Sequence, residues 1–511
     1  MAIVQPVTST ADSARRRLKL KNPATREELG EISVLNAAEV RARVAAARRA
    51  QPAFAALGFK RRAEIMLCAL DILLKQEDRF IDVIVGETGR SRMETLMMEL
   101  FPASDTLAYY AKYAERLLRD ESPSLHLMKQ KKLVVSYRPL GVIGVITPWN
   151  GPFVLAVNPV VQALMAGNAV VLKPSEVTPF SAKLVGELLT EAGLPPDVLQ
   201  VLEGDGETGA ALVEGGVDKI SFTGSVATGR KIGEACGRNL IPCTLELGGK
   251  SPSIVCGDAD VARAAKGCVV GAFFNAGQFC CATARVYVVD SVADEFTKGV
   301  VDYVRSLKQG TIGEFDLGPA IWPRQMEVIE RHVKDAVARG AKVLVGGAKN
   351  RELGDLFFQP TVLTQVSGEM QVMREETFGP VMTIVRVRDE AEALRLANDT
   401  SFGLAAAIWT RDAEKALELG RQIEAGHVCM NDISMTYGIH EAPFGGRKQS
   451  GLGQVHGAGG LKGYCYAQSI VLERFSLGQE DSWYPFTSAK ADGMRKAMRF
   501  IFGSKLGRLF T

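Results

Sequence analysis

The chain has 511 residues, more than one hydrophobic core usually serves, so we expect two or three domains. Hydrophobic residues make up 47% and charged residues 23%, which is ordinary for a globular enzyme. The 61 basic and 58 acidic residues leave a formal charge of +3, which gives no reason to expect nucleic acid as a partner.

Signals for targeting and for metal binding are weak. Residues 1–20 lack the apolar core of a signal peptide, and no run reaches the ~18 apolar residues of a membrane span. The five histidines are scattered without metal-ligand spacing, so we expect no metal. Nine cysteines without a C-x-x-C pair favour reduced thiols, and we expect a cytoplasmic protein.

Helical periodicity dominates the N-terminal part of the chain. Residues 37–75 and then 79–118 repeat apolar side chains at helical spacing. In the first of these segments the expected core positions are Val40, Val44, Leu67 and Leu70. Residues 132–137, KLVVSY, then indicate an exposed strand.

From Gly141 onward, expected strands alternate with expected helices. Buried strands are predicted at residues 142–146, 169–172, 199–202 and 219–222. This rhythm predicts a doubly wound parallel sheet, whose ligands gather at the C-terminal ends of the strands. A further series of strands, at residues 285–289, 341–345, 381–387 and 426–431, predicts a second α/β domain.

Polar motifs follow three of the strands in the first series. A helix start after Gly224 and Ser225 suits a phosphate, and Lys173 with Glu176 could hold ribose hydroxyls. No G-x-G-x-x-G fingerprint occurs at these turns, so ordinary strand–helix turns remain an alternative. Asn150 could donate to a developing oxyanion, or simply cap a turn.

The candidate reactive groups are Glu246, which precedes a pair of glycines, and Cys280. They are 280 − 246 = 34 residues apart, so one strand–helix unit between them can return both to one pocket. A thiolate there would attack a carbonyl carbon, and a carboxylate would later activate water. A turn glutamate and a buried structural cysteine are the alternative reading.

Seven motifs in register resemble the NAD(P)-dependent aldehyde dehydrogenase superfamily over residues 22–472. They are PWN at 148–150, KPSE at 173–176, FTGS at 222–225, LELGGK at 245–250, FFNAGQFCCA at 273–282, EETFGPV at 375–381 and PFGGRKQSGLG at 443–453. The resemblance implies an α/β fold of a Rossmann-like cofactor domain, a catalytic domain and a small β bridging arm that joins subunits, and a basic tail follows these domains. Their expected bounds are 1–120 with 140–248, then 249–445, then 121–139 with 462–480, and 481–511.

The resemblance also implies a role for each matching residue. Cys280 matches the nucleophile, Glu246 the general base, and Asn150 with the backbone N–H of Cys280 the oxyanion hole. The product would be a carboxylic acid, released from a thioester on Cys280 by activated water. NAD is the implied cofactor, with NADP possible, and its expected contacts are Ile146, Thr147, Pro148, Trp149, Lys173, Ser175, Glu176, Phe222, Thr223, Gly224, Ser225, Gly229, Leu247, Gly248, Glu376 and Phe378.

Three departures from the family pattern bear on the substrate. Gly151 stands where a Phe is common, and Phe279 directly precedes the nucleophile. Asn158 occupies a position at which members acting on acid semialdehydes tend to carry Arg. We therefore expect an uncharged aldehyde, unless Arg447 or Lys448 supplies the cation. A CoA-acylating dehydrogenase and a semialdehyde dehydrogenase remain alternatives, and Glu246 argues against the first.

The last stretch, residues 493–510, reads GMRKAMRFIFGSKLGRLF and lies beyond the family resemblance. It combines apolar residues at helical spacing with five cations and no acid, the pattern of a helix lying in a membrane surface. Packing on the body of the protein or on a partner subunit is the alternative, as is disorder. The resemblance also implies a homodimer or homotetramer.

Overall fold

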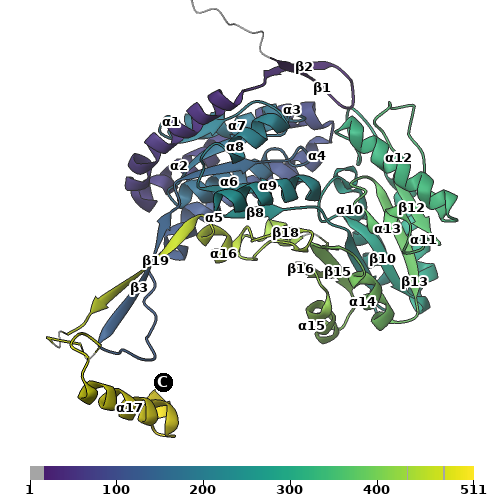
Figure 1. The fold of residues 1–511 in the computed structure, drawn as a ribbon. Coiled ribbons are helices and arrows are strands. Elements are labelled where there is room, and N and C mark those ends of the chain that lie inside the picture. Colours follow the sequence, from purple (N-terminus) through teal and green to yellow (C-terminus); the bar gives the residue numbers. More distant parts are fainter. Residues whose placement is uncertain (1–15, 434, 476–477, 481, 511) are drawn as a thin grey trace, which may run out of the picture.

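The computed structural model describes residues 16–433, 435–475, 478–480 and 482–510. Two α/β units, each built on its own sheet, form the body, and a pair of long strands projects from it (Figure 1). The α/β class predicted from the strand–helix rhythm is confirmed. Among the described helices, none is long and apolar enough to cross a membrane.

The first sheet has six strands in the order β18-β8-β7-β4-β5-β6, all parallel except β18. Its strands are β4 (Val142–Ile146), β5 (Ala169–Lys173), β6 (Leu199–Val201), β7 (Lys219–Thr223), β8 (Cys243–Glu246) and β18 (Gly451–Leu452). Helices cover both faces: α1 (Ala37–Ala56), α8 (Gly206–Val213) and α9 (Val226–Asn239) on one, α6 (Val154–Met165) and α7 (Pro179–Glu191) on the other.

Strand β4 shows why the sheet is apolar throughout. Ile143 and Val145 belong to the core under α6 and α7, whereas Val142 and Ile146 belong to the core under α1 and α9. Side chains alternate between the faces of a strand, so a strand covered on both faces needs apolar residues at every position. The four strands predicted in this part of the chain are confirmed.

The N-terminal segments surround this sheet. A hairpin of β1 (Arg17–Lys21) and β2 (Glu28–Ser33) precedes α1, α2 (Gly58–Lys75), α3 (Glu77–Thr88), α4 (Arg92–Thr95), a π-helical turn η1 (Leu96–Leu100) and α5 (Phe101–Leu117). Val40 and Val44 are buried as predicted. The prediction for Leu67 was wrong, because the buried face of α2 carries Ile65, Met66 and Ala69 and leaves Leu67 47% exposed.

The second sheet has seven strands in the order β11-β12-β13-β10-β9-β15-β16, and only β11 is antiparallel to its neighbour. They are β9 (Ser251–Val255), β10 (Thr283–Val289), β11 (Lys342–Val345), β12 (Thr361–Thr364), β13 (Val381–Val387), β15 (Ala405–Trp409) and β16 (His427–Met430). Helices α10 (Val261–Phe273) and α11 (Asp290–Ser306) pack on one face; α12 (Pro323–Ala338), α14 (Glu390–Asn398) and α15 (Ala413–Gln422) pack on the other.

Short elements complete the second half of the body. They are the 3-10 turns η2 (Phe274–Gly277) and η3 (Met435–Gly438), α13 (Gln371–Arg374), α16 (Gly457–Lys462), and the strand pair β14 (Phe402–Gly403) and β17 (Arg447–Lys448). Strand β18 follows β17 directly and pairs with β8, which ties this late segment to the end of the strand that carries Glu246.

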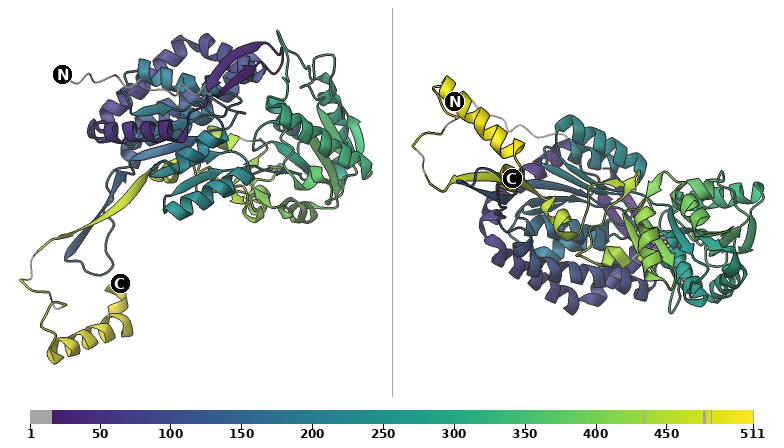
Figure 2. Two further views of the ribbon diagram at one scale, coloured as in Figure 1. Left: turned by 45° about the horizontal axis from the view of Figure 1, so that its top comes forward. Right: turned by 90° about the horizontal axis from the view of Figure 1, so that it is seen from below.

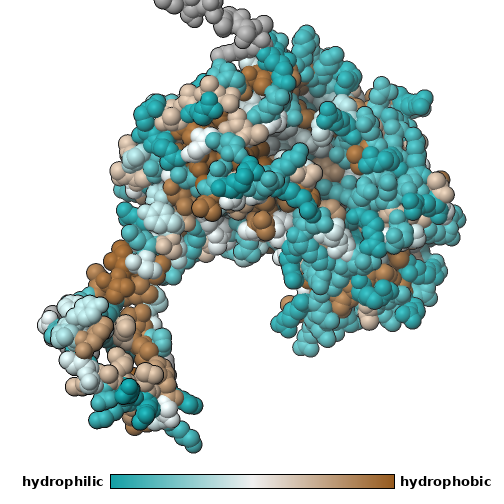
Figure 3. Space-filling model, in the orientation of Figure 1, coloured by the Kyte–Doolittle hydropathy of each residue, from teal (hydrophilic) through white to brown (hydrophobic). Residues whose placement is uncertain are grey.

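The projecting arm consists of β3 (Lys131–Pro139) and β19 (Cys465–Glu473), paired antiparallel along their whole length (Figure 2). Beyond β19 the chain reaches α17 (Ser488–Gly503) and the turn η4 (Gly507–Phe510), which lie away from the body. Apolar side chains gather on the surface of the arm (Figure 3). Its exposed residues Ile470, Val471, Leu472 and Phe475 account for part of this surface.

Candidate active site

The strand ends of the first sheet bring the predicted cofactor motifs together at one edge. In the parallel register Ile146 of β4 lies opposite both Lys173 of β5 and Phe222 of β7. Thr223 in turn lies opposite Glu246 of β8. The N–H of Thr147 donates to the carbonyl of Lys173 at 3.1 Å. Motifs separated by up to a hundred residues in the chain therefore share one edge of the sheet.

The start of α9 is built for a close approach to phosphate. Ser225 caps the helix, and its hydroxyl accepts from the N–H of Thr228 at 3.2 Å. A Cβ added at Gly224 would lie 2.5 Å from the Phe222 ring, and one at Gly229 would lie 2.5 Å from Leu247. These glycines let the helix pack tightly on the strand ends. Free N–H groups at its first turn then face the edge, as phosphate binding requires.

A charged pair follows β5 on the same edge, beside α8. The Nζ of Lys173 lies 3.2 Å from a carboxylate oxygen of Glu176. Lys173 is buried, and burial lowers its pKa, whereas the Glu176 side chain remains 39% exposed. Ser175 is buried and its hydroxyl accepts from the N–H of Val177. The pair offers both a donor and an acceptor for sugar hydroxyls.

The backbone brings Glu246 and Cys280 to one place, as their spacing predicts. Strand β9 and helix α10 occupy the segment between them. After Glu246, Gly249 packs so closely on the following loop that an added Cβ would lie 2.3 Å from the carbonyl oxygen of Cys280. Before Cys280, Asn275 and Ala276 adopt φ values of 52° and 50°. Left-handed conformations at two non-glycine residues are unfavourable, and they set the sharp turn that presents the cysteine.

Glu246 is a buried carboxyl without a local partner. It ends β8, and among the described residues none donates a hydrogen bond to either carboxylate oxygen. Burial, and secondarily the nearby Cys280, raises its pKa well above the ordinary value. A carboxyl with a raised pKa is a stronger base than an exposed one once it is ionised, which suits proton abstraction from water.

The two adjacent cysteines have different surroundings. Their sulfur atoms lie 3.9 Å apart. Cys281 is buried in an apolar cluster with Leu404, Phe444 and Val455, and its contact with Cys280 together with burial raises its pKa. Cys280 is partly exposed. Cys280 is therefore the more accessible of the two cysteines.

Asn150 is held against the turn that carries Cys280. Its Nδ2 donates to the carbonyl of Gln278 at 3.0 Å, and its own carbonyl accepts from Nδ2 of Asn275 at 3.1 Å. The side chain is buried. The Asn150 amide therefore lies against the backbone two residues before Cys280. Its second N–H can donate to an oxyanion.

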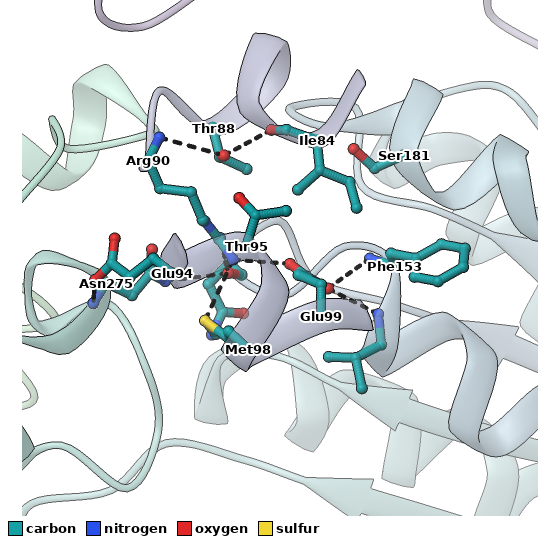
Figure 4. A network of polar contacts seen from close by, with 12 residues as sticks. Ile84, Thr88, Arg90, Glu94, Thr95, Met98, Glu99, Phe153, Ser181 and Asn275 are labelled. Atoms are coloured by element: carbon teal, nitrogen blue, oxygen red, sulfur yellow. Dashed lines mark hydrogen bonds and ion pairs between the residues drawn. The ribbon is translucent and has the colours of Figure 1, made fainter. Parts of the chain in front are cut away.

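A buried ionic network, which we did not predict from the sequence, fixes this arrangement (Figure 4). Arg90 donates to the carbonyl of Asn150 and pairs with Glu99 at 2.8 Å. Glu99 also accepts the N–H groups of Phe153 and Val154, at the start of α6. Nearby, Glu94 accepts the N–H of Asn275. Nothing in the local sequence distinguishes these charges from those of a solvent-exposed helix.

A small cavity adjoins Cys280 beside the loop that follows Glu246. One wall carries Glu376, which accepts the N–H of Gly249 at 2.8 Å and whose pKa burial raises to about 7. A Cβ at Gly248 would lie 2.3 Å from the same carboxylate. Phe378 also lines the cavity, and its ring meets Trp149 edge-on with centroids 5.3 Å apart.

The predicted cofactor contacts thus form a continuous series along one side of the molecule. It runs from Lys173 and Glu176, past the start of α9, to Glu376 and the cavity at Cys280. The glycines along this edge allow close backbone approach, and the donors suit a sugar at one end and a phosphate in the middle. These residues fit a dinucleotide whose reactive end reaches the thiol.

This combination of a thiol, a carboxyl and a dinucleotide edge defines a class of oxidoreductase, and comparison with known proteins identifies it. A model of the aldehyde dehydrogenase family matches residues 10–470. The chain belongs to this family and is an NAD(P)-dependent aldehyde dehydrogenase.

Individual relatives agree on the class but not on the aldehyde. The chain is 41% identical over 465 residues to a putative NADP⁺ succinate-semialdehyde dehydrogenase of Mycolicibacterium smegmatis, covering 90% of each chain. It is 39% identical over 477 residues to a 4,4'-diapolycopene aldehyde oxidase of a Methylomonas species, covering 93% of this chain and 89% of that protein. Among solved structures, an aldehyde dehydrogenase of Mycobacterium tuberculosis complexed with NAD⁺ superposes with a TM-score of 0.87 at 34% identity, covering 92% of this chain and 98% of that one.

Proposed function

We propose that this enzyme oxidises an uncharged, apolar aldehyde to the carboxylic acid, with Cys280 as nucleophile, Asn150 in the oxyanion hole and Glu246 as base. The choice of substrate class rests on the hydrogen bonds that Asn158 makes. Its position is where a cation would pair with the distal carboxylate of an acid semialdehyde, and its polar atoms are already engaged.

Asn158 is buried on α6 and bonded on every side. Its Oδ1 accepts from Gln162 at 2.5 Å, and its Nδ2 contacts Nε2 of His456 and lies 3.4 Å from the Tyr437 hydroxyl. Burial lowers the pKa of His456 well below the ordinary value, so this imidazole is neutral near pH 7. The cluster therefore offers no positive charge, although Tyr437, like Phe279 and Cys280, packs against the apolar cluster around Phe444.

The sequence offered Arg447 and Lys448 as the cations that could pair with a substrate carboxylate, and neither belongs to the Asn158 cluster. Lys448 pairs with Glu424 at 2.6 Å and donates to the carbonyls of Asn398 and Thr400. Arg447, its neighbour on β17, is exposed on the short strand that pairs with β14. These contacts favour a neutral substrate over an acid semialdehyde.

An apolar surface beside the site supports the same class of substrate. Met93, Met97 and Phe101 follow one another at intervals of four residues through α4, η1 and α5, and they are 63%, 55% and 76% exposed. Their segment contacts the site at Gly151, where an added Cβ would lie 3.5 Å from Met98. The same Cβ would lie 3.1 Å from Leu155, so glycine at this point lets α6 and the Met98 segment pack closely beside the site. A long hydrocarbon chain could rest on this surface while its aldehyde reaches Cys280.

The chemistry follows from what each side chain can do. The Cys280 thiolate adds to the aldehyde carbon, and the Asn150 amide with the Cys280 N–H donates to the resulting oxyanion. When bound, NAD(P)⁺ supplies the acceptor for the hydride that leaves this carbon. Glu246 then takes a proton from water as that water attacks the thioester, and the acid leaves with the Cys280 sulfur restored.

A substrate panel tests the proposal. We expect decanal to exceed succinate semialdehyde in kcat/KM by at least roughly tenfold, or about 1.4 kcal/mol in transition-state binding. Met97→Ser should lower kcat/KM for decanal more than for butanal, because only the longer chain would reach that surface. Leu240→Ser removes a 91% exposed leucine at the far end of α9 and serves as the control.

Two results would contradict the proposal. One is a preference for succinate semialdehyde of tenfold or more. The other is release of the acyl group as acyl-CoA instead of free acid when CoA is supplied, since Glu246 would then have no water to activate. Free acid formed at the same rate with and without CoA supports hydrolysis by the Glu246 route.

A further inference from the structure

The segment beyond the arm has no place in the body of the enzyme. Every residue of α17 is at least partly exposed, and the helix lies at the far end of the arm (Figures 1 and 2). The family match ends at residue 470, and the similar solved chain from Mycobacterium tuberculosis is covered almost completely by 92% of this one. The family fold is therefore complete without residues 482–510.

Helix α17 carries an exposed apolar stripe along one side. Met494, Met498 and Phe502 recur every four residues and are 53%, 54% and 52% exposed. At about 100° per residue, Lys496 lies roughly opposite this stripe, and Arg495 and Arg499 flank it on one side. Thr487 caps the helix start by accepting the N–H of Lys490, so the sequence specifies the helix as well as its faces.

The apolar face continues on both sides of the helix. After α17, the turn η4 folds back so that Gly507 lies against the backbone of Phe500 and Ile501, with Leu506 and Leu509 exposed. Before α17, Trp483, Tyr484 and Phe486 are 58%, 79% and 69% exposed. Exposed Trp and Tyr beside a basic amphipathic helix are the side chains that favour the boundary between lipid headgroups and acyl chains.

Charge identifies the surface that this segment fits. Residues 488–510 carry six cations (Lys490, Arg495, Lys496, Arg499, Lys505 and Arg508), against the single acid Asp492. Asp492 already pairs with Arg495 at 3.1 Å. A basic polar face opposite an apolar face matches an anionic lipid surface, where each cation near the headgroups strengthens binding.

We propose that residues 482–510 form a membrane-surface anchor that lies in the headgroup region of an anionic bilayer and holds the enzyme there. The helix would lie along the surface with Met494, Met498 and Phe502 directed into the lipid. The arm would set the distance between the bilayer and the body. This proposal is independent of the identity of the substrate.

The test is cosedimentation of the full-length enzyme with vesicles of phosphatidylcholine and phosphatidylglycerol. We expect binding at low salt that weakens as salt rises, and much weaker binding to pure phosphatidylcholine. The triple variant R495Q/K496Q/R499Q should bind roughly a hundredfold more weakly, at about fivefold per cation. M498D/F502D should abolish binding by removing the apolar face. K334Q/R351Q/R411Q, which removes three exposed cations from the body, should bind like the parent enzyme.

A second measurement separates the membrane from a partner subunit. Truncation after residue 480 should abolish vesicle binding and leave the number of subunits and the melting temperature unchanged. If the parent enzyme binds the anionic vesicles no better than the truncated form does, the proposal is overturned. It is equally overturned if truncation lowers the number of subunits or the melting temperature, because the segment would then be packed on protein. Equal loss of vesicle binding in R495Q/K496Q/R499Q and in the control K334Q/R351Q/R411Q would also overturn the proposal.

Discussion

At the residue scale, Cys280 and Cys281 differ chiefly in exposure, since their sulfur atoms are only 3.9 Å apart. Cys281 is enclosed by Leu404, Phe444 and Val455, whereas Cys280 lines the cavity with Glu376 and Phe378. Packing alone therefore buries the thiol of Cys281 and leaves that of Cys280 accessible. The first prediction tests this assignment.

Cys280→Ala should abolish aldehyde oxidation, because no thiolate remains to attack the carbonyl carbon, while NAD⁺ binding survives. Cys281→Ala should retain most activity. The measurements are NADH production with a saturating aldehyde and NAD⁺ affinity by calorimetry. Equal losses in the two variants would contradict the assignment of Cys280.

Glu246→Gln should slow thioester hydrolysis more than acylation, by roughly 2–4 orders of magnitude, because glutamine cannot accept the proton of water. Stopped-flow fluorescence should show a burst of NADH followed by a depressed steady rate. In the parent enzyme the Glu246 pKa is raised, so the carboxylate is lost as pH falls through that raised value. Hydrolysis should accordingly rise with pH, and a variant with parental turnover and an unchanged pH profile would exclude Glu246 as the base.

At the scale of elements, the π-helical turn η1 and the start of α6 are joined by the buried pair Arg90–Glu99. Glu99 holds two N–H groups of α6, and Arg90 holds the carbonyl of Asn150. Burial raises the pKa of Glu99, whereas the neighbouring Arg90 opposes that shift. The pair positions Asn150 without touching a substrate.

Glu99→Gln should lower the free energy of unfolding by about 3–5 kcal/mol, because Arg90 would keep a buried charge without its counter-ion. It should also lower kcat, through Asn150, more than it raises KM. Asp78→Asn, which breaks an exposed pair with Arg92, is the matched control and should leave the melting temperature nearly unchanged. Calorimetric unfolding and steady-state kinetics check both effects. A Glu99 variant as stable as the control would show that the pair has no structural role.

At the scale of the whole molecule, the arm is a two-stranded ladder that leaves one edge of β19 without a strand partner among the described residues. Glu121 contacts the outer side of β3 at Val135, so β19 has the more open edge. Ile470 and Leu472 are 39% and 45% exposed on one face of β19. A long, partly apolar strand edge of this kind is a template for pairing with another chain unless something covers it.

The parent enzyme should therefore have at least twice the mass of one chain in light scattering, as a homodimer or homotetramer joined through the arm. Ile470→Asp combined with Leu472→Asp should reduce the mass to that of one chain, because charges would be buried in the joint. The truncation after residue 480 removes the tail and keeps the arm, so it should keep the parental number of subunits. A parent enzyme that is already monomeric would contradict this prediction.

The sequence by itself determined the strands and the motifs at their ends. Apolar runs such as residues 142–146 can only be strands covered on both faces, and parallel strands place their C-terminal ends at one edge. The class of enzyme and the pair Glu246 and Cys280 followed from motifs of a few residues each. Periodicity predicted the buried face of α2 less well, because several neighbouring positions are apolar. Leu67 was assigned to the core, whereas its neighbour Met66 is the buried residue.

Only the tertiary structure decided the contacts between distant segments. The link of Arg90 and Glu99 to Asn150, and of Glu94 to Asn275, joins residues that no local pattern relates. The raised pKa of Glu246 likewise depends on burial by β7, β18 and the Cys280 loop. Desolvation is a property of everything packed around a group, so a sequence can name the carboxyl but cannot give its basicity. For the same reason the sequence showed an amphipathic tail, and only the fold showed that its apolar face is left uncovered.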